Sequence, residues 1–151
     1  MKLYELPAET KAATGFTHKA IVTHVDLTEA TADTDQTIAL LSVAAGDVVE
    51  KAAYKLVTAF SDASDGAFND TKVQVGDGTD TDEYIAATQV NVNGTEVLYA
   101  ANVNTVPFAY TAADTVDLLV ESMTAKSLSD LDAGEIHIYL AVTKLSSLYA
   151  S

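Results

Sequence analysis

The side chains with the clearest chemical potential are carboxylates crowded into a short turn. Asp77, Asp80, Asp82 and Glu83 lie there, and an earlier loop at residues 61–70 holds three more aspartates. Calcium takes several oxygen ligands and mixes carboxylates with loop carbonyls, so either loop could supply them. The spacing does not match an EF-hand, and aspartate and glycine are also ordinary turn residues. We therefore expect no cofactor; the alternative is calcium held at a subunit contact by Asp77, Asp80 and Asp82.

The imidazoles offer a second kind of chemistry, but only three are present: His18, His24 and His137. A zinc or acid–base site would need them to converge with one another or with carboxylates. His24 and His137 lie on predicted polar strand faces, where they could be neighbours only if those strands pair. The chain has no cysteine, no Gly-x-Ser-x-Gly elbow and no glycine-rich phosphate loop. We therefore predict that the protein is not an enzyme.

Basic recognition chemistry is largely missing from this chain. It has eight Lys, no Arg and a net charge of -14. A nucleic-acid reader needs a basic stripe that displaces counterions, and anionic lipid would repel such a chain. Residues 1–11 lack the apolar core of a secretory signal, and no apolar run is long enough to cross a bilayer. We expect synthesis in the cytoplasm of a host, with neither nucleic acid nor membrane as a partner.

The elements that would position these side chains are short strands. Residues 36–43, 114–120 and 135–145 are apolar or alternate between apolar and polar residues, as half-buried strands do. In the last of these, Ile136, Ile138 and Leu140 face inward, which leaves Tyr139 on the exposed side. Further strands are expected at residues 20–27, 71–75 and 84–85, with a hairpin at Asn93-Gly94. About eight strands separated by turns predict an all-β fold, an antiparallel, jelly-roll-like β-sandwich.

Two segments carry weaker patterns. Residues 1–17 have no clean period and are expected to form an N-terminal arm, which leaves residues 18–151 as a single sandwich domain. In residues 48–60 the apolar side chains fit both a helical and an alternating spacing, so periodicity alone leaves strand and helix open.

Four runs give the chain a family resemblance: VTHVDLTEAT (22–31), VQVGDGTDTDEYI (73–85), YTAADTVD (110–117) and AGEIHIYLAV (133–142). Together they resemble small structural proteins of tailed bacteriophages, most closely capsid decoration (cement) proteins. In such proteins an alternating strand follows an Ala-Gly turn and ends in Thr-Ala-Phe. Ala45-Gly46 and Thr58-Ala59-Phe60 match those positions, so the resemblance implies a strand at residues 48–60.

The resemblance also implies a function. Such a protein would decorate and stabilise the capsid exterior as a homo-oligomer, most simply a trimer, with itself and the major capsid protein as partners and the virion surface as its location. Phe16 and Tyr139 are the candidate interface residues. The alternative is a head-fibre or tail-associated module that binds a receptor or carbohydrate, with exposed tyrosines stacking on sugar rings.

Overall fold

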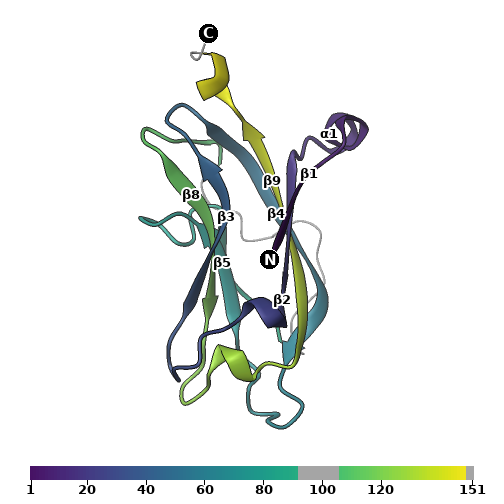
Figure 1. The fold of residues 1–151 in the computed structure, drawn as a ribbon, viewed down its shortest axis with the longest axis vertical. Helices are drawn as coiled ribbons and strands as arrows, with labels where there is room; N and C mark the ends of the chain where they lie inside the picture. The colour runs from purple at the N-terminus through teal and green to yellow at the C-terminus, as the bar shows by residue number, and fades with distance from the viewer. Residues whose placement is uncertain (92–105, 149–151) are drawn as a thin grey trace.

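The computed structural model describes residues 1–91 and 106–148, which form two antiparallel sheets packed face to face (Figure 1). The five-stranded sheet has the order β1-β2-β9-β4-β7, and the four-stranded sheet has the order β3-β8-β5-β6. The strands are β1 (Lys2–Glu5), β2 (His18–Thr23), β3 (Gln36–Val43), β4 (Val48–Ser61), β5 (Lys72–Gly76), β6 (Ile85–Gln89), β7 (Phe108–Ala109), β8 (Asp114–Glu121) and β9 (Ala133–Thr143). Helix α1 (Ala8–Thr14) and three 3₁₀ turns, η1 (His24–Asp26), η2 (Leu128–Asp130) and η3 (Leu145–Leu148), complete the described elements.

The strand order follows from a nested pairing of the chain with itself. Strand β2 pairs with β9, β3 with β8, β4 with β7, and β5 with β6, all antiparallel. The chain is thus a long hairpin wrapped into two sheets, which is the jelly-roll arrangement. The predicted all-β, jelly-roll-like sandwich is confirmed.

The core lies between the two sheets and is built from the inward phase of each strand. On β9, Ile136, Ile138 and Leu140 are buried as the alternation predicted. On β8, Val116, Leu118 and Val120 meet them from the other sheet, and are also buried. Each long strand therefore keeps its other phase free to form an outer face.

Strand β2 differs from the expected strand at residues 20–27. It ends at Thr23, because the Asp26 carboxylate accepts hydrogen bonds from the Thr23 backbone N–H (2.9 Å) and hydroxyl (3.0 Å) and turns the chain into η1. Val22 lies in the inward phase of β2 and has 0% exposure. His24 leaves the strand altogether, and Val25 becomes 70% exposed.

The two weakly patterned segments have defined structures. Residues 48–60 fall within β4, so the strand assignment is confirmed. Residues 1–17 contain β1, which pairs with β2 at the edge of the five-stranded sheet, and helix α1, which stands outside that sheet (Figure 1). The hairpin predicted at Asn93-Gly94 lies outside the described residues.

None of the helices in the described part of the chain has the length and apolar character needed to span a membrane.

Candidate functional site

The two predicted interface residues meet on the outer face of the five-stranded sheet. The phase of β9 that buries its isoleucines turns Tyr139 to the outside. Helix α1 ends at Gly15, whose φ of 75° is left-handed and reverses the chain, so that Phe16 comes down onto the same face. The ring centroids of Phe16 and Tyr139 are 5.9 Å apart, with the planes tilted by 52°.

Small residues underlie this aromatic pair. Ala53 of β4 and Ala141 of β9 are buried beneath it and form, with Phe16, a second apolar cluster separate from the core. Phe16 is therefore buried within its own chain, at 6% exposure, while Tyr139 is half-buried and not fully exposed as its phase suggested. The same burial raises the pKa of the Tyr139 phenol. Of the two, Tyr139 retains the surface that a partner could contact.

Lysine side chains cover the two rings. The Lys51 ammonium lies 4.4 Å from the centroid of the Phe16 ring and donates a hydrogen bond to the Thr14 carbonyl (2.6 Å). The Lys19 ammonium lies 5.8 Å from the centroid of the Tyr139 ring. A cation–π contact of this kind stabilises the folded protein by roughly 0.5–1 kcal/mol at an exposed site. It also holds the ammonium group over the ring.

The strand registers extend this pattern across the sheet, because residues directly opposite one another project to the same face. One row across β1, β2, β9 and β4 consists of Lys2, Ile21, His137 and Lys55. The next row consists of Tyr4, Lys19, Tyr139 and Ala53. We call the outer surface formed by these two rows and Lys51 the lysine face.

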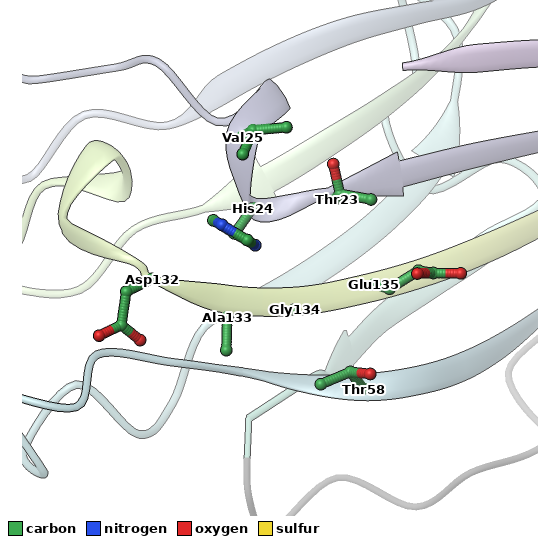
Figure 2. A pocket seen from close by; sticks show the side chains of 8 residues that line it. All are labelled: Thr23, His24, Val25, Thr58, Asp132, Ala133, Gly134 and Glu135. Carbon is green, nitrogen blue, oxygen red and sulfur yellow. The ribbon is translucent and has the colours of Figure 1, made fainter.

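A shallow hollow borders the lysine face where β9 begins (Figure 2). Its lining comes from the end of β2 and η1 (Thr23, His24, Val25), from Thr58 of β4 and from residues 132–135. Figure 2 shows His24 over the start of β9, with Asp132 and Glu135 pointing in different directions. A second hollow, lined by Met1, β1, β2, η1 and Glu135 of β9, shares Thr23, Val25 and Glu135 with the first, so the two hollows adjoin.

The histidines do not converge. Strands β2 and β9 do pair, but His137 lies opposite Ile21, and His24 lies beyond the end of β2. The nearest partner of His137 is Glu135, at 2.6 Å between Nε2 and Oε1. His18 contacts the Thr17 hydroxyl, and burial lowers the pKa of its imidazole. This spacing brings together no acid–base pair of histidines.

The carboxylates of the alternative calcium site, Asp77 and Asp80, accept hydrogen bonds from backbone groups of their own turn. Asp77 is buried, and its Oδ1 accepts hydrogen bonds from the backbone N–H groups of Thr79 (2.8 Å) and Asp80 (2.9 Å). Asp80 in turn accepts one from the Asp82 N–H (3.3 Å), and hydrogen bonds from Asp82 lower the pKa of the Asp80 carboxyl. Within residues 1–91 and 106–148, no group of three or more His, Asp or Glu side chains is arranged to hold a metal ion.

Sequence reasoning missed the lysines of this face. Lys51, Ala53 and Lys55 occupy alternate positions of β4, opposite in phase to the buried Ala52, Tyr54 and Leu56. That alternation was present in the sequence, but it has meaning only if the segment is a strand, which periodicity left open.

The fold is shared with a known viral component. A chain in the structure of the cyanophage Pam1 capsid asymmetric unit is similar, with a TM-score of 0.55 and 12% sequence identity. The alignment covers 82% of this chain and 79% of that one. No protein-family model and no curated protein matches the sequence. At this level of identity, the likeness concerns the fold.

Proposed function

We propose that this chain is a non-enzymatic structural protein of a bacteriophage virion, which decorates and stabilises the capsid exterior as a homo-oligomer, most simply a trimer. The observation that carries the proposal is the jelly roll formed by the described residues, because the chain is similar over 82% of its length to a chain of a phage capsid asymmetric unit. The phage-like sequence runs support the same role independently of that likeness.

The physical mechanism of such a protein would be adhesion. Its core sits between the two sheets, so the outer faces and loops are available for contacts. Several weak contacts per oligomer would act together, because binding of one subunit raises the effective concentration of the others at the shell. This function requires no nucleophile, metal or basic groove.

Co-sedimentation with capsid shells tests the proposal. Purified protein is mixed with shells of the major capsid protein from the same virus, and the pellet is assayed for saturable, stoichiometric binding. We expect saturation and a higher disruption temperature of the decorated shells. Absence of binding at saturating concentrations would contradict the proposal, and hits on a glycan array would then favour the receptor-binding alternative.

A further inference from the structure

The charge of this protein is divided very unevenly between its faces. The whole chain carries -14, yet four of its eight lysines lie on the lysine face: Lys2, Lys19, Lys51 and Lys55. Three carboxylates accompany them. Glu50 sits at the β-bulge of β4, Glu135 is hydrogen-bonded to His137, and Asp26, beside Lys2 in the second hollow, is paired with the N-terminal ammonium. The lysine face is therefore positive on a strongly negative molecule.

Three of the four lysines of this face have no carboxylate partner among the described residues, and Lys51 donates its hydrogen bond to the Thr14 carbonyl. Lys2, Lys19 and Lys55 form no ion pair with any residue in the described ranges. By contrast, Lys126 and Lys144, outside the face, are bound to Asp65 and Asp47. An unpaired charge beside aromatic surface is available for an intermolecular contact.

Exposed apolar side chains border the same face. Three of the six large hydrophobic residues that are exposed in the described ranges line the hollows beside the lysine face: Met1, Tyr4 and Val25. Val25 and Tyr4 help to line the two hollows beside the lysine face. A partner that neutralised the lysines would cover this apolar surface as well, which is the usual composition of an interface.

The matching negative surface lies elsewhere on the same chain. Residues 77–83, the acidic turn, connect β5 to β6 in the other sheet and contain four carboxylates and no lysine. Asp77 is buried, whereas Asp80 is exposed and Asp82 and Glu83 are half-buried. The turn projects from the side of the sandwich (Figure 1).

We propose that the lysine face of one copy binds the acidic turn of a second copy, in a head-to-tail contact. The proposal rests on the homo-oligomer of the proposed function and names its interface. A two-fold contact between lysine faces would place like charges together, which costs free energy. A head-to-tail contact uses different surfaces on the two copies and generates a closed ring when the rotation between them permits.

Charge reversal of one lysine, with a matched control, tests the contact. Lys19→Glu reverses a charge on the lysine face. Lys72→Glu, the control, reverses a charge on β5 of the other sheet. The Lys72 ammonium lies 3.5 Å from the Asp70 carboxylate. Mass by light scattering and sedimentation velocity give the dissociation constant. We expect Lys19→Glu to weaken self-association at least about tenfold and Lys72→Glu to leave it within about twofold. Equal effects of the two variants, or a monomeric wild-type protein, would overturn the proposal.

A charge swap within one chain identifies the partner surface. The variant Asp80→Lys/Asp82→Lys should lose self-association, as should Lys19→Glu/Lys55→Glu. The chain carrying all four substitutions should regain it, because the attraction is restored with its sign exchanged. Failure of the fourfold variant to associate, with circular dichroism showing a folded protein, would exclude the acidic turn as the partner.

These results separate the interface from the proposed function. If the wild-type oligomer dissociates on charge reversal but never sediments with shells, the interface proposal stands and capsid decoration is contradicted. If the wild-type protein is a monomer and still saturates the shells, capsid decoration stands and the proposed interface is contradicted.

Discussion

The buried carboxylate of Asp47 links two segments at one end of the sandwich. Asp47 lies in the turn between β3 and β4 and has 0% exposure. It accepts hydrogen bonds from the Ala44 N–H (3.0 Å), the Ser146 N–H (3.3 Å) and the Ser146 hydroxyl (2.6 Å), and the Lys144 ammonium lies 3.2 Å away. The segment that follows β9 is thereby tied to the β3–β4 turn.

This network makes stability depend on pH. Burial alone would raise the pKa of Asp47, but hydrogen bonds from Ser146, Ala44 and Lys144 outweigh it and lower the pKa from 3.8 to about 2. A carboxylate with a depressed pKa contributes stability above its unfolded value and loses it as the pH falls toward the folded value. We predict that Asp47→Ala lowers the free energy of unfolding by about 1–3 kcal/mol at pH 7. This difference from the wild-type protein should shrink as the pH falls from 4 to 2.

Urea unfolding at pH 7 and pH 3 measures both effects. The control is Asp130→Ala, which removes an exposed carboxylate of η2 and should change stability little at either pH. A deficit for Asp47→Ala that is the same at both pH values would show that its ionisation contributes nothing.

The second prediction at the residue scale concerns Gly134, near the start of β9. Its φ is 142°, and a Cβ there would lie 2.2 Å from Cδ1 of Phe60. We predict that Gly134→Ala costs about 3 kcal/mol, from backbone strain and overpacking together. Gly66→Ala is the control, because a Cβ at Gly66 meets nothing within 4 Å. Thermal unfolding of the two variants compares them, and equal melting temperatures would contradict the prediction.

At the scale of elements, the sequence predicted those strands that bury one face. β3, β8 and β9 have an inward phase of apolar residues, and their predicted bounds lie close to the observed ones. β1, which pairs with β2, could not be found this way, because all four of its residues are exposed and none marks an inward phase. The contact between Phe16 and Tyr139 also needed the three-dimensional pairing, since the two residues come from opposite ends of the chain.

The small residues of β4 give a prediction that runs against strand propensity. Ala53 stands where a β-branched residue would be expected, but it is completely buried in the cluster formed with Phe16 and Ala141. We predict that Ala53→Val destabilises the protein by about 1–3 kcal/mol through overpacking. Ala39→Val, at an exposed position of β3, should be neutral or slightly stabilising. Chemical denaturation checks both, and a stabilised Ala53→Val would contradict this packing.

The acidic turn gives a prediction about metal. Because Oδ1 of Asp77 already accepts two backbone hydrogen bonds, calcium would have to displace them in order to use that oxygen. We expect the melting temperature to be the same in millimolar calcium and in excess chelator. A reproducible rise with calcium, abolished by Asp80→Asn, would instead establish a site in this turn.

At the scale of the whole molecule, folding separates positive from negative charge in a way that the sequence does not display. The lysines are scattered along the chain, and only the pairing of β1, β2, β9 and β4 gathers four of them on one face. The net charge of -14 excluded a basic groove, but it could not show that the few positive charges share a surface. We predict that self-association weakens as salt is raised, because the opposed charges are screened. Sedimentation velocity across a salt series checks this, and association that strengthens with salt would indicate an apolar interface.

The most direct test of the central claim, capsid decoration, is electron cryomicroscopy of capsid shells with and without the purified protein. The account predicts additional density on the outer surface of the shell, into which the two-sheet sandwich fits as a repeated oligomer. Shells that show no added density at saturating protein concentration would contradict it.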